Sequence, residues 1–356
     1  MASPEKSYPL ISIIIPCLNE ATVIAKCLDS VLANDYPKES LEVWVVDGMS
    51  KDGTRGIVGE YNQKFPFIKL IDNPQLAQQS ALNLGIARAR GEIIIRMDAH
   101  CGFSTNYISQ CVRYLMESGA DNVGGRLVTV PRADTLSGRA IAIAMSKLFG
   151  VGNSRFRVWR HSDDLEPRWV HTVPYSCYRR EVFDRIGLFN EQLERSEDAE
   201  FHLRMREAGC KTLFVPSIVS YYYSRSDLKS FWMHAVDNGF WAVMPTMYTG
   251  RLVVSLRHLA PLGLVAGLGG LAGLALSGWF SPIPLAVLAG SYAVANLGVS
   301  ARVALEQRDV RMLFVLPVVF GGLHFGYGIG SFIGAWKVLK SSLFRWLWRR
   351  PMTTGR

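Results

Sequence analysis

An uncharged segment near the C-terminal end of the sequence limits the possible folds more than any other feature. From residue 259 to residue 280 the chain contains no Asp, Glu, Lys or Arg. As a helix this segment would be about 33 Å long, which matches a bilayer hydrocarbon core of about 30 Å. Residues 283–301 and 312–336 are also uncharged. The sequence therefore predicts a helical membrane region over residues 252–336, with two or three membrane segments.

Glycines recur at intervals of four within these segments. They are Gly263 and Gly267, Gly269 and Gly273, and Gly326, Gly330 and Gly334. Small residues with this spacing allow two helices to approach closely in lipid. We expect them at contacts between membrane helices, and such contacts could also hold a homo-oligomer together.

The basic C-terminal tail, residues 337–356, bears on the number of membrane crossings. Three full crossings from a cytoplasmic N-terminus would place this tail outside, against the tendency of Lys and Arg to stay on the cytoplasmic side. Pro317, followed by Gly321 and Gly322, would allow the third segment to fold back as a re-entrant hairpin. We therefore expect a hairpin there, with a third full crossing as the alternative.

The net charge of +9 would at first suggest nucleic-acid binding. Lys and Arg are not gathered with aromatic residues on one soluble element, however, and the densest basic run, KVLKSSLFRWLWRR, follows an apolar segment. Basic residues beside a membrane segment attract anionic lipid headgroups. The charge therefore indicates membrane lipids, and not nucleic acid, as a partner.

The first 226 residues have the patterning of a soluble α/β domain. Apolar, largely β-branched runs predict buried strands at residues 11–15, 41–47, 67–72 and 92–97. Residues at helical spacing predict helices at 23–32, 76–90 and 107–116, with Gly91 and Gly119 closing the last two. This order predicts a mostly parallel, Rossmann-like central sheet. The N-terminus has no signal-peptide pattern and the six cysteines form no C-x-x-C pair, so we expect this domain in the cytoplasm with reduced thiols.

Less regular segments follow. Residues 131–172 are polar and rich in Arg, and are interpreted as mobile loops. Ser196 can cap a helix that runs to Arg206 and is closed by Gly209. Residues 227–251 are rich in Phe, Trp and Met, which favours an amphipathic helix at the membrane surface.

Polar residues stand at the end of each predicted strand. They are Asn19 and Glu20, Asp47, Asp72 and Asn73, and Asp98 and His100. Ligands of open α/β sheets bind outside the carboxyl ends of the strands. The sequence therefore predicts one ligand cleft lined by acids.

Four motifs, in order, resemble the successive signatures of glycosyltransferase family 2: SIIIPCLNE, VVDGMSKDGT, NLGIARARGEIIIRMDAH and SEDAEFHLRMREAG. The resemblance implies a GT-A fold and sugar transfer from a nucleoside-diphosphate sugar. The DAH variant and the C-terminal membrane segments are most similar to bacterial exopolysaccharide glycosyltransferases of the succinoglycan glucosyltransferase type. That similarity implies UDP-glucose as donor and an inner-membrane, multi-pass protein whose catalytic domain faces the cytoplasm.

By the resemblance, the nucleotide sugar is bound by the first strand ends. The positions concerned are Pro16, Leu18, Asn19, Glu20, Asp47 and Asp98. The structural alternative is that Asn19 and Asp47 cap the helices that follow them. Asp52, within a Gly-containing turn, is interpreted as a turn residue. No G-x-G-x-x-G or Walker loop is present, so a metal is expected to neutralise the diphosphate.

Asp98 and His100 occupy the positions of the family's D-x-D metal motif. The metal bridges the diphosphate and neutralises the leaving group. Histidine in place of the second acid suits Mn²⁺ better than Mg²⁺, which strongly prefers oxygen ligands. The alternative for His100 is a structural, hydrogen-bonded histidine.

Asp198 matches the acid of the family's E-D motif and is the expected general base, with Glu197 positioning the acceptor or exchanging roles with it. A positioned carboxylate that accepts a proton contributes about 10² to 10⁴ in rate. The structural alternative is that both acids stabilise a helix N-terminus. The expected reaction is a single in-line displacement with inversion.

The acceptor expected from the resemblance is a polyprenyl-diphosphate-linked oligosaccharide. Residues 234–241, HAVDNGFW, lack the Q-x-x-R-W of processive relatives, so one hexose per encounter is expected. Four arginines are weaker candidates for diphosphate contact: Arg179, Arg180, Arg204 and Arg206. The rival functions are a polyprenyl-phosphate sugar synthase and a membrane sensor or scaffold that binds nucleotide sugar without turnover.

Overall fold

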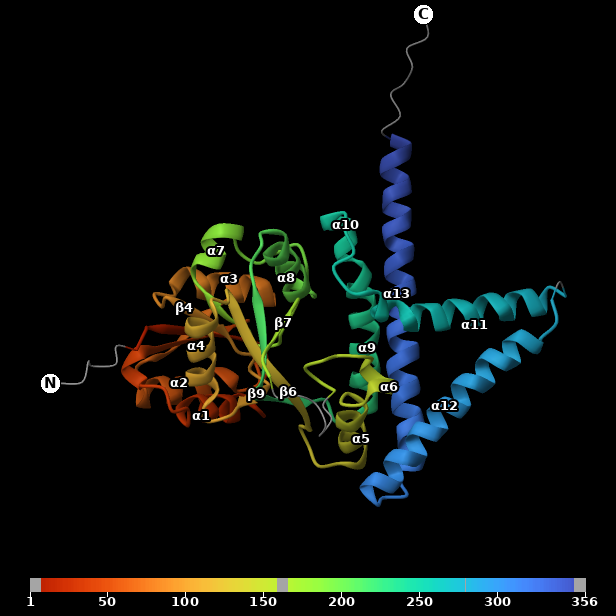
Figure 1. The fold of residues 1–356 in the computed structure, drawn as a ribbon, viewed down its shortest axis with the longest axis horizontal. Helices are drawn as coiled ribbons and strands as arrows, with labels where there is room; N and C mark the ends of the chain where they lie inside the picture. Colours follow the sequence, from red (N-terminus) through yellow and green to blue (C-terminus); the bar gives the residue numbers. More distant parts are fainter. Residues whose placement is uncertain (1–7, 159–165, 279, 349–356) are drawn as a thin grey trace, which may run out of the picture. The chain divides into compact units, whose positions relative to one another are not determined.

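The computed structural model describes residues 8–158, 166–278 and 280–348 (Figure 1). The chain forms two compact units. Unit 1 comprises Met1–Val130 and Ser154–Tyr223, and unit 2 comprises Pro131–Asn153 and Ser224–Arg356.

Unit 1 is built on a mixed sheet. Its strands, among the described residues, are β1 (Ile11–Cys17), β2 (Leu41–Asp47), β3 (Ile68–Asp72), β4 (Ile93–Arg96), β5 (Cys101–Phe103), β6 (Asn122–Pro131), β7 (Arg168–Val170), β8 (Cys177–Arg179) and β9 (Thr212–Ser224). Their order is β3-β2-β1-β4-β8-β6-β9-β5, with β7 paired to β9. The first four strands are parallel, as predicted, whereas β8 is antiparallel to β4 and β6, and β5 and β7 are antiparallel to β9.

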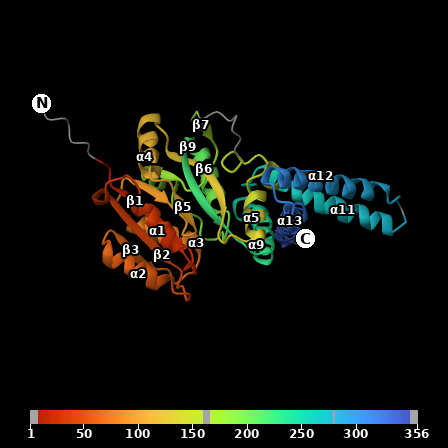
Figure 2. The ribbon, with the colours of Figure 1, turned by 90° about the horizontal axis from the view of Figure 1, so that it is seen from below.

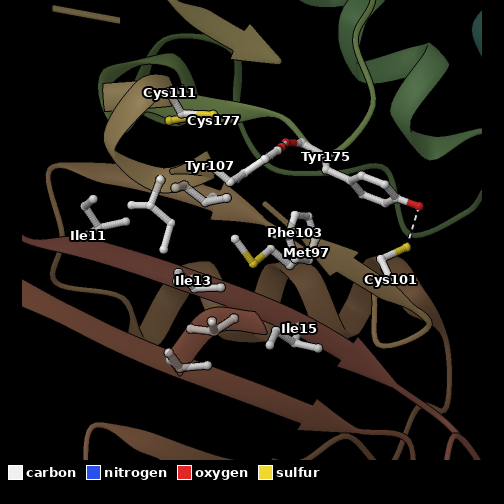
Figure 3. Close-up of a cluster of buried hydrophobic side chains, with 14 of the residues drawn as sticks. Ile11, Ile13, Ile15, Met97, Cys101, Phe103, Tyr107, Cys111, Tyr175 and Cys177 are labelled. Atoms are coloured by element: carbon white, nitrogen blue, oxygen red, sulfur yellow. Dashed lines mark hydrogen bonds between the residues drawn. The ribbon is translucent and has the colours of Figure 1, made fainter. Parts of the chain in front are cut away.

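Helices cover both faces of the parallel strands, which explains the continuous apolar runs. The helices of unit 1 are α1 (Ile24–Leu32), η1 (Lys38–Ser40), α2 (Thr54–Lys64), α3 (Gln78–Arg88), α4 (Tyr107–Ser118), α7 (Glu181–Ile186) and α8 (Glu197–Glu207). Ile11, Ile13 and Ile15 of β1 pack with α1, α2 and α4, and Figure 3 shows them beside Phe103 and Tyr107. Ile14 faces the opposite way, into a cluster with α3, α7 and α8.

The glycines expected to close helices have different roles. Gly119 and Gly209 adopt positive φ directly after α4 and near the end of α8, as predicted. Gly91 does not close α3, whose C-cap is Ala89. A Cβ at Gly91 would lie 2.5 Å from the backbone nitrogen of Ser12. Gly91 is therefore needed for close packing of the chain against β1, so the prediction was wrong for this residue.

Unit 2 is helical. It contains α5 (Leu136–Ala144), α6 (Leu148–Val151), α9 (Leu228–Val243), α10 (Pro245–Thr249), η2 (Leu256–Leu259), α11 (Ala260–Leu276), α12 (Ile283–Gln307) and α13 (Met312–Trp348). Ala140 and Ile141 of α5 are completely buried in a cluster with residues of α9, α12 and α13. The interpretation of residues 131–172 as mobile loops was therefore wrong for the first part of that segment, which forms packed helices. Residues 159–165 lie outside the described residues.

Three helices of unit 2 are long and apolar enough to cross a membrane. They are Arg257–Leu276, Ile283–Gln307 and Met312–Ser341. α11 and α12 form a hairpin (Figure 2), and both pack against α13. α13 continues without a break through Pro317, so the predicted re-entrant hairpin is wrong. Proline is tolerated in membrane helices where neighbouring groups satisfy the freed backbone.

The glycine triplet of α13 faces α9. A Cβ at Gly330 would overlap the Val236 carbonyl, and a Cβ at Gly334 would lie 2.7 Å from the Phe240 carbonyl oxygen. The predicted close contact therefore forms within the chain, between α13 and the segment expected at the membrane surface. A Cβ at Gly273 would have no heavy atom within 4 Å among the described residues.

These contacts predict opposite results for two glycine substitutions. We expect Gly330→Leu to lower the thermal unfolding temperature of the detergent-solubilised protein, because the new side chain forces α9 away from α13. Gly273→Leu adds the same side chain to an open helix face and should leave the unfolding temperature close to that of the wild type. Equal stability of the two variants would mean that α9 and α13 do not pack as described.

Candidate active site

The carboxyl ends of β1, β2 and β3 are held together by backbone hydrogen bonds. The Gly48 N–H donates to the Cys17 carbonyl at 2.7 Å, and the Asn73 N–H donates to the Asp47 carbonyl at 2.8 Å. Each loop contains one non-glycine residue with positive φ: Asn19 (54°), Met49 (59°) and Leu76 (62°). Strained backbone of this kind is concentrated at ligand sites. The three loops are therefore candidates for ligand contact.

Of the residues predicted to bind nucleotide on β1, Pro16 is buried within the strand, and Leu18 is 44% exposed. A Cβ at Gly48 would lie 3.3 Å from Leu18 Cδ1. Any residue other than glycine at position 48 would therefore require the Leu18 side chain to shift. The exposed Leu18 side chain is thus fixed beside the β2 loop.

Asp47 is completely buried at the end of β2. Its carboxylate accepts hydrogen bonds from the Ser50 N–H at 2.9 Å and from the Ser50 hydroxyl, and pairs with Arg55 at 2.8 Å. Arg55 also pairs with Asp72 at 2.7 Å. Both oxygens of Asp47 are therefore engaged in the loop before α2.

The helix-capping alternative for Asn19 and Asp47 is wrong. α1 begins after Val23 and α2 after Gly53, and neither helix has a side-chain cap. Asn19 Oδ1 instead accepts the Lys51 N–H at 2.9 Å, which joins the β1 and β2 loops.

Asp52 has the turn role that was predicted for it. Its carboxylate accepts hydrogen bonds from the Thr54 hydroxyl, the Thr54 N–H and the Ala21 N–H. The Thr54 hydroxyl contributes most to holding the pKa of Asp52 below its usual value.

Asp98 and the E-D motif are joined by one arginine. Arg96, the last residue of β4, pairs through Nε with Asp98 Oδ1 at 3.1 Å and through Nη1 with Glu197 Oε1 at 3.0 Å. Gln78 Nε2 also donates to Asp98 Oδ1, at 3.5 Å. Both contacts use Oδ1, and no partner of Oδ2 is found among the described residues. The fold thus brings the acid after β4 to the first turn of α8, about a hundred residues later in the chain.

The acids around Arg96 influence one another electrostatically. Burial lowers the pKa of Arg96, but Asp98, Glu197 and Asp198 together raise it well above its usual value. Burial also raises the pKa of Glu197, Arg96 opposes this effect, and Asp198 and Asp98 add to it. The pairing at 3.0 Å keeps the Glu197 carboxylate directed at the guanidinium. Glu197 is therefore held in place beneath the surface, unlike its neighbour.

Asp198 is exposed in the first turn of α8, where its Oδ1 accepts the Ala199 N–H at 2.7 Å. Its carbonyl contacts Nδ1 of the buried His202 at 2.7 Å, and burial lowers the pKa of that imidazole. The turn begins at Ser196, whose φ of 61° is left-handed and whose side chain makes no capping bond, so the predicted cap is wrong. Of the two acids, only Asp198 is open to a solvent-borne group.

His100 is paired with Glu20. Its Nδ1 lies 2.9 Å from Glu20 Oε1, and its ring meets that of Tyr222 edge-on at 5.4 Å. Histidines that bind metal through one nitrogen usually donate the other N–H to a carboxylate in this way. Within the described residues, however, no three His, Cys, Asp or Glu side chains are grouped to hold a metal ion. Asp98 and His100 would therefore supply two ligands, and a bound diphosphate would have to supply others.

Three of the candidate arginines are occupied by backbone carbonyls. Arg179 donates to Ala120 and Leu115, Arg180 to Gly91 and Ala89, and Arg204 to Ile186 and Leu188. Arg204 also pairs with Glu200 at 2.7 Å. These contacts give the three arginines structural roles.

Sequence reasoning missed Arg96 and Gln78. The signal for Arg96 was a charge inside the run EIIIRMDAH, at a strand position that burial disfavours unless an acid pairs with it. Gln78 gave no comparable signal, because it stands among polar residues at the start of α3.

Comparison with known proteins identifies the family. Residues 12–187 match the model of glycosyl transferase family 2. A curated relative in Methanococcus voltae, "Dolichyl N-acetyl-alpha-D-glucosaminyl phosphate 3-beta-D-2,3-diacetamido-2,3-dideoxy-beta-D-glucuronosyltransferase", is 32% identical over 64% of this chain and 71% of its own length. The chain belongs to glycosyl transferase family 2.

One further relative and one solved structure match most of this family 2 chain. The "Succinoglycan biosynthesis protein ExoA" of Rhizobium meliloti is 29% identical over 87% of this chain and 90% of that protein. The solved structure "Mannosyltransferase PcManGT from Pyrobaculum calidifontis in complex with GDP-Man and Mn2+" superposes with a TM-score of 0.62 at 19% identity, over 94% of this chain and 91% of that one. The fold is GT-A. The chain is a family 2 glycosyltransferase, and three helices among its described residues are long and apolar enough to cross a membrane.

Proposed function

We propose that the chain is an inverting, non-processive glycosyltransferase that moves a hexose, with glucose favoured, from a nucleoside-diphosphate sugar to a polyprenyl-diphosphate-linked oligosaccharide. The observation that carries the proposal is the bridge from Asp98 through Arg96 to Glu197. This bridge connects the end of β4, which is assigned to donor binding, with the first turn of α8, which is assigned to proton transfer. A single displacement requires the donor and the general base at one site.

The names of similar proteins support polysaccharide synthesis from a nucleotide sugar. The relative in Rhizobium meliloti acts in succinoglycan biosynthesis, and the solved mannosyltransferase binds GDP-Man and Mn²⁺. A nucleotide sugar is accordingly proposed as the donor here, and the resemblance to the succinoglycan glucosyltransferase type favours UDP-glucose. The three apolar helices would keep the enzyme in the inner membrane, where a long-chain isoprenoid acceptor also resides. We place unit 1 on the cytoplasmic side, where nucleotide sugars are made.

The proposed reaction follows from the accessibility of the two acids. The acceptor hydroxyl attacks the anomeric carbon while Asp198 accepts its proton, because Asp198 is the exposed acid of the pair. Glu197, buried and paired with Arg96, fixes the position of that turn. The nucleoside diphosphate leaves from the opposite face, so that an α-linked donor gives a β-glycoside.

A divalent metal fits the residues at the donor end. Asp98 Oδ2 and His100 Nε2 are the atoms that would hold it, since the opposite atoms of both side chains are engaged by Arg96 and Glu20. An imidazole ligand favours Mn²⁺ over Mg²⁺. When bound, the metal would neutralise charge on the leaving diphosphate.

Replacing His100 tests this metal assignment. We expect His100→Ala to raise, by at least about tenfold, the Mn²⁺ concentration required for half-maximal UDP binding, because one ligand is lost. The measurement is a titration of UDP binding with Mn²⁺ by calorimetry. His171→Ala removes an exposed histidine and should leave the Mn²⁺ requirement unchanged. An unchanged requirement in His100→Ala would give His100 the structural role.

The function itself is tested by assaying purified enzyme in detergent. Released nucleotide is measured for a panel of nucleotide sugars, with and without Mn²⁺, using a polyprenyl-diphosphate oligosaccharide or a polyprenyl phosphate as acceptor. Transfer to the first acceptor, one sugar at a time, is the expected result. Transfer to polyprenyl phosphate alone would identify a polyprenyl-phosphate sugar synthase. Tight UDP binding without turnover on any acceptor would indicate a sensor or scaffold.

A further inference from the structure

Arg157 belongs to the segment that follows α6, and its side chain contacts residues of β6 and β9. The Leu127 N–H donates to the Phe156 carbonyl at 2.7 Å, which fixes the backbone next to Arg157. The guanidinium lies over the Tyr222 ring, 5.2 Å from its centroid, and Nη1 donates to the Thr129 hydroxyl at 3.3 Å. The side chain is therefore held in position from both strands.

Tyr222 places Arg157 next to His100. The ring that supports the guanidinium on its face meets the His100 ring at 5.4 Å with an interplanar angle of 75°. His100 in turn pairs with Glu20 from the β1 loop. One aromatic side chain thus separates Arg157 from a proposed metal ligand.

A second route connects Arg157 with Asp98. Cys101 donates a hydrogen bond to the Tyr175 hydroxyl, as Figure 3 shows. Burial raises the pKa of Tyr175 well above its usual value, Asp98 adds to this effect, and Arg157 opposes it. Both charges therefore act on the Tyr175 hydroxyl, which also holds Cys101.

The charge of Arg157 is not neutralised within the part of the chain that the structure describes. Its polar contact there is one long hydrogen bond to a neutral hydroxyl, and no carboxylate of the described residues is within ion-pair distance. Arg55 and Arg96, by contrast, each pair with two acids. A half-buried guanidinium has five N–H donors, so most of its donors are available to an anion.

We propose that Arg157 binds the diphosphate of the nucleotide-sugar donor, next to Tyr222 and His100. This assignment rests on the proposed function. A guanidinium matches phosphate oxygens with two parallel hydrogen bonds, and stacking on Tyr222 orients the fork before the donor arrives. Negative charge grows on the diphosphate as the glycosidic bond breaks, so Arg157 also stabilises the leaving group.

The test compares two ligands that differ in their phosphates. UDP and uridine are titrated by calorimetry into the full-length protein in detergent with saturating Mn²⁺. Arg157→Gln should weaken UDP binding by about tenfold to hundredfold, the loss typical of a hydrogen bond to a charged group, and should leave uridine binding unchanged. Arg157→Lys should restore part of the UDP affinity, because lysine keeps the positive charge but lacks the two parallel N–H donors of the guanidinium.

Arg113 provides a matched control. It lies over the ring of Tyr114 at 4.6 Å and donates one hydrogen bond, to Gln110, at an exposed position on α4. Arg113→Gln removes the same kind of stacked arginine and should change neither affinity. The unfolding temperature of each variant is measured alongside.

Three results would overturn the assignment. Unchanged UDP affinity in Arg157→Gln would mean that the side chain does not contact the diphosphate. An equal loss for UDP and uridine would mean that Arg157 supports the fold or the nucleoside end of the site. A wild-type protein that binds neither UDP nor GDP would contradict the proposed function itself, and the role of Arg157 with it.

Discussion

Replacing Asp198 with Asn is expected to lower kcat by about 10²- to 10⁴-fold while donor affinity stays unchanged. The substitution keeps the size of the side chain and removes only its ability to accept a proton. Asp198 is exposed in the first turn of α8, so an acceptor hydroxyl can reach it. Its neighbour Glu197 is 4% exposed and pairs with Arg96, which leaves it poorly placed to take a proton from the acceptor. The measurements are initial rates of sugar transfer and calorimetric titration with UDP.

The control addresses the alternative that Asp198 merely stabilises a helix N-terminus. Asp184 is an acid in the first turn of α7, and Asp184→Asn removes a comparable charge from a helix start. This variant should retain full kcat. If Asp198→Asn instead lost only thermal stability, the helix-terminus role would be correct.

Two further outcomes would reassign the chemistry. Loss of UDP binding in Asp198→Asn would show that this side chain belongs to the donor site. Activity that survives in Asp198→Asn but not in Glu197→Gln would exchange the roles of the two acids. Transfer to polyprenyl phosphate that is insensitive to Asp198→Asn would favour a polyprenyl-phosphate sugar synthase. A phosphate acceptor is already largely deprotonated, so it needs no general base.

The parallel half of the sheet was predictable because its signal is local. β1 and β2 are mostly apolar, since both faces of these strands are buried. The antiparallel half has weaker signals: β5, β7 and β8 contain three residues each. Their pairing depends on partners far away in the sequence, such as β9 for β5, and no periodic pattern develops over three residues.

The candidate site was predictable as a set of residue types but not as a set of contacts. The acids at the strand ends follow from the rule that ligands bind at that edge of the sheet. The engagement of Asp47 by Arg55, and the bridge from Asp98 to Glu197, depend on tertiary packing. Residues 96 and 197 are about a hundred positions apart, so a single sequence gives no indication that they meet.

The helices between β6 and β7 were missed for a related reason. The sequence LSGRAIAIA of α5 is short, and its apolar residues could equally belong to a loop. Its burial comes from α9, α12 and α13, which contribute Phe231, Val303 and Leu316 to the same cluster. Only the folded unit shows that residues 131–153 belong with the C-terminal helices.

This grouping predicts that deleting residues 252–356 will not give a monodisperse soluble protein. The deletion removes α11, α12 and α13 but keeps α5 and α9, whose buried residues include Ile141 and Phe231. Exposing such a large apolar side chain costs about 1.5–3 kcal/mol, and a contiguous exposed patch promotes aggregation. We expect this variant to sediment in an ultracentrifuge or to elute as aggregates in gel filtration.

A second deletion, matched to the compact units, should behave differently. It ends at Tyr223 and replaces residues 131–153 with a short Gly-Ser linker, so that only unit 1 remains. The linker is feasible because the Leu127 backbone nitrogen and the Phe156 carbonyl oxygen, which flank the removed segment, are only 2.7 Å apart. We expect this variant to be monodisperse without detergent and to bind UDP. A monodisperse protein from the first deletion would contradict the grouping of α5 with the C-terminal helices, because that deletion retains part of their apolar cluster. Aggregation of both deletions would mean that unit 1 does not fold by itself.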